Sequence, residues 1–103
     1  MVETATARFH AGQIVQHRQY RYRGVIFDVD PCCLAGEELY VSDTLPERGQ
    51  PWYHVLVDGS EVVTYVAESS LIADRNHAPV DHPLVSVVFG SYQDGRYFRG
   101  LDA

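Results

Sequence analysis

The segment from His17 to Arg23 combines residue types that bind other macromolecules. It reads HRQYRYR and contains no acidic residue. Guanidinium groups pair with phosphates or carboxylates, and tyrosine rings stack on nucleobases or anchor protein interfaces. The pattern therefore predicts a loop that binds DNA or a protein, formed by His17, Arg18, Tyr20, Arg21, Tyr22 and Arg23. A structural role suits the same residues equally: the tyrosines would close the mouth of the fold, and the arginines would pair with the acids of residues 28–47.

A second candidate surface lies on a predicted hairpin. The pair Asp58-Gly59 separates two strand-like segments, residues 52–57 and 61–66, and supplies the positive φ angles of a tight turn. Because side chains alternate across a strand, one face then carries mostly branched residues suited to the core: Tyr53, Val55, Val57, Val62, Thr64 and Val66. The other face carries Trp52, His54, Leu56, Val63 and Tyr65. If another segment covers this second face, we expect core; if none does, we expect a binding groove lined by Trp52, His54 and Tyr65.

Side chains suited to catalysis or metal binding lack the spacing that these functions need. The chain has five histidines, and no two stand at a spacing that puts a pair of ligands on one element: His10, His17, His54, His77 and His82. Cys32 and Cys33 are adjacent, and neither they nor Ser69-Ser70 lie in a nucleophile motif. We therefore expect no enzyme, no cofactor and no metal.

Length and charge narrow the function further. A chain of 103 residues that is 46% hydrophobic can build one core, so we expect one domain. The net charge is −6, and all eight basic residues are arginine. This acidic balance argues against strong nonspecific DNA binding, which depends on neutralising phosphates. Residues 1–8 do not read as a signal peptide and no segment is apolar enough to span a membrane, so we expect the cytoplasm.

The order of the predicted elements is typical of a small barrel. Residues 13–17 and 25–29 read as strands joined by the loop of arginine and tyrosine. The hairpin follows, then one 3₁₀ turn at 67–70 and a short strand at Leu71-Ile72. This order predicts a mainly β fold, a small SH3-like β-barrel.

The predicted barrel covers residues 9–73. A short segment precedes it, an acidic excursion interrupts it, and a C-terminal extension follows it. Residues 1–8 are expected to be disordered, and residues 9–103 to form the single domain. The acidic excursion at 31–50 is either a solvated loop or a surface that presents Leu39, Tyr40 and Val41 to a protein.

The C-terminal extension, residues 74–103, permits two local structures. A helix starting at Asp81-His82-Pro83 would place one apolar stripe on Leu84, Val85, Val88, Phe89 and Tyr92. A strand would instead use the alternation of Val85, Val87 and Phe89. After a turn at Asp94-Gly95, we expect Tyr97-Phe98 to pack back on the barrel.

Four short motifs carry a family resemblance. They are GQIVQH at 12–17, YRYRGVI at 20–26, PWYHVLV at 51–57 and TYVAE at 64–68. Together they resemble the YccV-like family, also known as the HspQ heat-shock family. The resemblance implies a small β-barrel that works by binding and has no cofactor.

What the family does defines the expected partners. Its members are described as binding hemimethylated DNA and as promoting the degradation of denatured proteins by the Lon protease. The resemblance and the acidic charge together favour a protease or unfolded protein substrates as the partner. DNA, bound through the loop at 17–23, is the alternative. The sequence does not decide whether the chain forms homo-oligomers.

Overall fold

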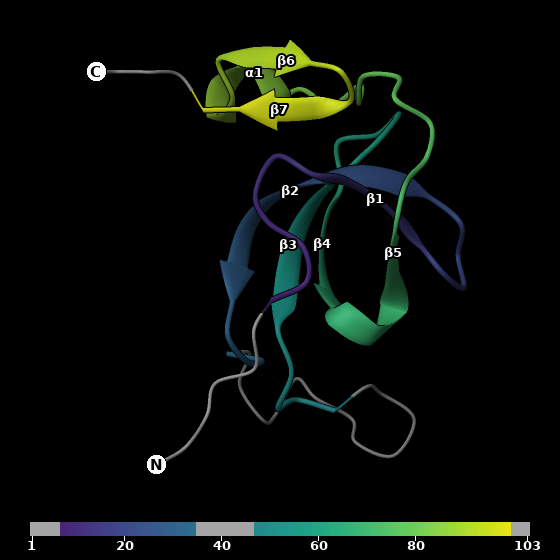
Figure 1. The fold of residues 1–103 in the computed structure, drawn as a ribbon, viewed down its shortest axis with the longest axis vertical. Helices are drawn as coiled ribbons and strands as arrows, with labels where there is room; N and C mark the ends of the chain where they lie inside the picture. Colours follow the sequence, from purple (N-terminus) through teal and green to yellow (C-terminus); the bar gives the residue numbers. More distant parts are fainter. Residues whose placement is uncertain (1–6, 35–46, 100–103) are drawn as a thin grey trace.

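The computed structural model describes residues 7–34 and 47–99, which form one five-stranded antiparallel sheet and a smaller C-terminal unit (Figure 1). The spatial order of the strands in the sheet is β4-β3-β2-β1-β5. Their bounds are Ile14–His17 (β1), Arg23–Asp30 (β2), Trp52–Val57 (β3), Val63–Ala67 (β4) and Leu71–Ala73 (β5). The mainly β prediction is confirmed.

The predicted hairpin is formed by β3 and β4. Its register runs from Leu56 opposite Val63 to Trp52 opposite Ala67, and Gly59 in the turn has a φ of 76°. This register gives the two faces expected from the alternation of side chains. Tyr53, Val55 and Val66 join one buried cluster with Phe9, Val15, Ile26 and Leu71.

The turn end of this face is less buried than expected. Val62 is 52% exposed and Val57 is half-buried. Val57 lies opposite Gly24 of β2, which offers no side chain to cover it. A side chain at Gly24 has no room, because an added Cβ would collide with the Leu56 carbonyl oxygen and lie 2.6 Å from Val55 Cγ1.

The ends of the sheet are connected rather than paired. The 3₁₀ helix η3 (Glu68–Ser70) leads from β4 to β5, and β5 pairs with β1 from Val15 opposite Ala73 to His17 opposite Leu71. No bridge joins β4 to β5 in the described part of the chain, so the sheet differs from a closed barrel. β5 pairs with β1 along one edge, and within residues 7–34 and 47–99 its other edge pairs with no strand.

The C-terminal unit consists of α1 (Val85–Val88), β6 (Ser91–Gln93) and β7 (Arg96–Phe98). A helix is formed rather than the alternative strand, but it is shorter than expected: it begins at Val85 and ends before Phe89, and Tyr92 lies in β6. Asp94 and Gly95 make the turn between β6 and β7 with positive φ angles of 52° and 82°.

A second core joins this unit to the sheet, and it buries the opposite face of β3 at Leu56. Its members are Ile14, Val25, Leu56, Val80, Phe89 and Tyr97. Tyr97 thus packs back on the sheet as expected, whereas Phe98 is 43% exposed. Within residues 7–34 and 47–99, no helix has the length and apolarity needed to cross a bilayer.

Candidate functional site

The loop between β1 and β2 is held in shape by His17, which is buried. Its Nδ1 accepts the backbone N–H groups of Gln19 and Tyr20, each at 3.1 Å. The His17 N–H donates to the Tyr22 carbonyl at 2.9 Å, and the His17 carbonyl accepts the Arg21 N–H at 3.0 Å. The imidazole also packs against the rings of Tyr20 and Tyr22, with centroids 4.7 and 5.2 Å away. The loop is therefore ordered by one central side chain.

Arg21 adopts an unusual backbone conformation within this loop. Its φ is 65°, in the left-handed region where a residue with a Cβ is disfavoured. The Arg21 carbonyl accepts the side-chain amide of Gln16 at 3.3 Å, and its N–H is bonded to His17. These bonds hold the strained residue, and its side chain is exposed.

Four residues of the loop are exposed, and besides Gln19 they are the charged or aromatic residues Arg18, Tyr20 and Arg21. Tyr20 is 70% exposed. The two guanidinium groups form no ion pair or hydrogen bond with any residue in 7–34 or 47–99. An ordered loop that carries two unpaired cations and an exposed ring can contact a phosphate, a carboxylate or a flat apolar surface. We call these three residues the loop tip.

Tyr22 and Arg23 face the body of the protein instead. The Tyr22 hydroxyl lies 2.9 Å from Thr64 Oγ1, and burial raises the pKa of this tyrosine. Arg23 pairs with Asp58 and Asp74, each at 3.0 Å, and donates to the carbonyl groups of residues 76, 78 and 79. The structural alternative had expected the arginines to pair with the acids of residues 28–47. The acidic partners of Arg23 are instead Asp58 and Asp74. Arg23 therefore ties the segment after β5 to the sheet.

The second candidate surface is an aromatic row that runs across three strands. The ring centroids of Trp52 and Tyr65 lie 5.2 Å apart, those of Tyr65 and His54 4.7 Å, and those of His54 and Phe27 5.6 Å. Trp52 is buried with Cys33 and Ala67, whereas His54 and Tyr65 are half-buried. The Leu34 N–H donates to the Tyr65 hydroxyl at 3.0 Å. The chain after β2 thus covers the Trp52 end of the row, which is not an open groove there.

Polar groups of β2 join this row, and the sequence reasoning did not include them. Asp30 Oδ2 accepts the Tyr65 hydroxyl at 2.7 Å and lies 3.1 Å from His54 Nε2. Burial, with Asp30 adding to it, raises the pKa of Tyr65 to about 12. Asp28, Asp30 and His54 place one ligand atom each within 4.8 Å of one another, the donor set of a metal site. Asp28 Oδ1 accepts the Val29 N–H at 2.9 Å, so each of the three side chains already has a hydrogen-bond partner within the protein.

The acidic excursion at 31–50 was expected to present three residues to a protein. These residues lie outside the described part of the chain: Leu39, Tyr40 and Val41. The two flanking segments meet where the Cys33 N–H donates to the Arg48 carbonyl at 2.9 Å.

The role of His17 predicts that acid loosens the loop. Burial lowers the pKa of His17 from its ordinary 6.5, so below that pH the unfolded chain binds a proton that the folded chain resists. Stability attributable to His17 is therefore present above pH 6.5 and is lost as the pH falls, by at most about 1.4 kcal/mol per pH unit. Protonation also removes the Nδ1 acceptor.

A comparison of urea unfolding at about pH 7.5 and about pH 5 checks this, because these two values lie above and below the ordinary histidine pKa of 6.5. The control is His17→Asn, whose side-chain oxygen can accept the same N–H groups but does not titrate. We expect wild type to lose more stability than the variant on acidification. Parallel stability curves for the two proteins would contradict the prediction.

A comparison with protein-family models places these features in a known group. The model described as hemimethylated DNA-binding protein YccV like matches residues 7–96. The match covers most of the chain and includes the whole five-stranded sheet, the loop tip, the aromatic row and α1.

Proposed function

The chain belongs to the YccV-like family of hemimethylated DNA-binding proteins, and on this basis we propose that it is a non-catalytic binding module that recognises another protein through the loop tip. In this proposal the partner is a Lon-type protease or a denatured substrate of that protease, and the setting is the cytoplasm. The module then acts as an accessory factor that brings substrate and protease together.

The observation that carries the proposal is the ordered loop with Arg18, Tyr20 and Arg21 free to make contacts. Arginine and tyrosine are enriched among residues that dominate binding energy at protein interfaces. Because His17 already orders the backbone of the loop, binding a partner causes a smaller loss of conformational entropy than it would for a flexible loop.

The charge of the chain favours a protein over a polyanion. The net charge is −6, so the molecule as a whole repels DNA, while the two cations of the loop tip suit an acidic patch on a protein.

A second feature also suits contact with a denatured polypeptide. Exposed apolar side chains occur at the start of β4 and on the helical segment: Val62, Val63, Leu84 and Val87. The two segments are neighbours, because His82 Nε2 lies 3.1 Å from the Val62 carbonyl oxygen. Exposed apolar surface of this kind favours binding of unfolded chains, which expose their own apolar residues.

Degradation of a denatured substrate by a purified Lon-type protease tests the proposal. We expect the wild-type protein to speed substrate turnover, and the double variant R18Q/R21Q to need about tenfold more protein for the same effect. The matched control is R75Q, which removes an exposed arginine of the segment between β5 and α1. If wild type leaves turnover unchanged, the accessory role is wrong.

DNA is a second candidate partner, favoured by the family description and by Arg18 and Arg21, whose guanidinium groups pair with no residue of 7–34 or 47–99. A gel-shift series with unmethylated, hemimethylated and fully methylated duplexes tests it. If Arg18 and Arg21 contact phosphates, the log–log slope of affinity against salt should be about −2, at about −0.9 for each contact. The R18Q/R21Q variant should lose this slope. Absence of any shift at low salt would remove DNA as a partner.

A further inference from the structure

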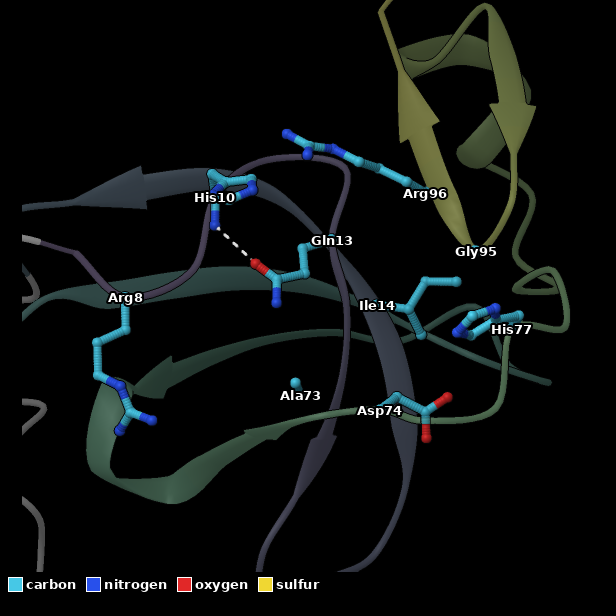
Figure 2. A pocket seen from close by; sticks show the side chains of 9 residues that line it. All are labelled: Arg8, His10, Gln13, Ile14, Ala73, Asp74, His77, Gly95 and Arg96. Atoms are coloured by element: carbon cyan, nitrogen blue, oxygen red, sulfur yellow. Dashed lines mark hydrogen bonds between the residues drawn. The ribbon is translucent and has the colours of Figure 1, made fainter.

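A hollow of about 330 Å³ lies between the N-terminal segment, the β1–β5 edge of the sheet and the C-terminal hairpin (Figure 2). Segments far apart in the sequence meet there. Its polar lining comes from Arg8, His10, Gln13, Asp74, His77 and Arg96. None of these residues belongs to the loop tip or to the aromatic row, so an inference about the hollow does not rest on the proposed function.

The hollow carries positive charge in an acidic protein. The guanidinium groups of Arg8 and Arg96 lie over the rings of Phe9 and Phe98, at 5.4 and 5.5 Å from the centroids. Neither forms an ion pair with a residue of the described ranges 7–34 and 47–99. The one carboxylate in the lining, that of Asp74, is already paired with Arg23 at 3.0 Å. Arg23 is shared between Asp74 and Asp58, but the two arginine charges of the lining still exceed its single carboxylate, so the lining keeps a net positive charge.

The neutral residues of the lining add hydrogen-bond donors. Gln13 Oε1 accepts the backbone N–H of His10 at 3.3 Å. The side-chain nitrogen of Gln13 therefore points away from the His10 backbone. Figure 2 shows this nitrogen directed into the space above Ala73, with Arg8 on one side and Asp74 on the other. The imidazoles of His10 and His77 each carry at least one N–H. Donors thus surround the space from several elements.

The shape of the hollow also depends on a glycine. Gly95, in the turn between β6 and β7, has a φ of 82°, and an added Cβ would lie 2.9 Å from His77 Cγ. Only glycine lets the turn pack this closely against the imidazole. Arg96 follows this turn directly and lines the hollow.

We propose that this hollow binds a phosphoryl oxyanion. A phosphate offers several acceptor oxygens, which match arginine, amide and imidazole donors that approach from different directions. The volume is at the lower end of the range for ligand sites, which suits a phosphate with a small attached group. The phosphoryl group comes either from a small phosphomonoester or from the backbone of a nucleic acid.

Titration of the labelled protein followed by NMR tests this with three probes: inorganic phosphate, a nucleoside 5′-monophosphate and a short DNA duplex. With the two small probes, up to about 10 mM, we expect saturable shifts of the amides of Gln13, Gly95 and Arg96. The variants R8Q and R96Q should each weaken binding about threefold to tenfold. The matched control R75Q should bind as wild type, since Arg75 does not line the hollow.

The variant Q13E provides the sharpest comparison. It keeps an oxygen to accept the His10 N–H but replaces the inward-facing donor by a carboxylate oxygen, so affinity should fall at least about tenfold. If the duplex binds and loses affinity in Q13E as the small probes do, the phosphoryl group belongs to nucleic acid. If only the small probes do so, the ligand is a phosphomonoester. No saturable shift with any probe, or affinities unchanged in R8Q, R96Q and Q13E, would overturn the proposal.

Discussion

Replacing Arg23 with methionine is expected to lower the free energy of unfolding by about 2–4 kcal/mol. Methionine keeps most of the apolar stem but removes the charge and all of the donors. The change leaves the carboxylates of Asp58 and Asp74 without their cation, and both are largely shielded from solvent. It also removes the donors of the hydrogen bonds that the exposed carbonyl groups of residues 76, 78 and 79 accept.

The loss should be concentrated in the segment after β5. Asp58 links Arg23 to that segment, because its Oδ1 accepts the Asp81 N–H at 2.6 Å. Urea unfolding measures the total effect, and hydrogen exchange at Val80 and Tyr97 shows whether the C-terminal unit loosens first.

The control for Arg23 is Arg18→Met, a change at an exposed arginine of the loop tip, which should alter stability by less than about 0.5 kcal/mol. The pair of variants separates a structural arginine from a binding arginine. If Arg23→Met leaves stability unchanged and abolishes partner binding, Arg23 belongs to the interface and the structural role assigned to it is wrong.

Gly12→Ala is expected to destabilise the protein by at least about 3 kcal/mol. Gly12 has a φ of 93°, and an added Cβ would collide with the Tyr97 carbonyl oxygen. The residue cannot simply move away, since its N–H donates to the Ile26 carbonyl at 2.7 Å and its carbonyl accepts the Tyr97 N–H at 2.9 Å. The substitution therefore drives the C-terminal hairpin away from the sheet.

Gly59→Ala provides the matched control for this effect. Gly59 also has a positive φ, 76°, but an added Cβ would meet nothing within 4 Å. Its loss should be limited to the cost of the backbone conformation, about 1–2 kcal/mol. Thermal and urea unfolding of both variants compare the two costs. Equal destabilisation would mean that the contact with Tyr97 carries none of the effect.

Part of the candidate site was predictable from the sequence. The composition of residues 17–23 indicated a binding loop, and Arg18, Tyr20 and Arg21 are exposed in it. The same composition could not separate these residues from Arg23, whose partners are 35 and 51 positions away in the chain. Which arginine is free depends on where distant carboxylates are placed by folding.

The aromatic row gives a similar lesson. The alternation of side chains placed Trp52, His54 and Tyr65 on one face, and the register confirms this arrangement. Whether that face is open depends on the segment after β2, which brings Cys33 onto Trp52 and Leu34 onto the Tyr65 hydroxyl. Neither the alternation of side chains nor the turn residues of the hairpin indicate whether another segment covers this face.

By itself, the amino-acid sequence determined the hairpin and its two faces, the turn at Asp94-Gly95, the mainly β class and the family. These features follow from backbone preferences and side-chain alternation, which depend on residues a few positions apart. Only the tertiary structure decided the open sheet, the second core under the C-terminal unit, the pairing of Arg23 and the hollow between Arg8 and Arg96. Each of these joins segments that are remote in the chain, and their meeting is set by the packing of the whole molecule rather than by any local preference.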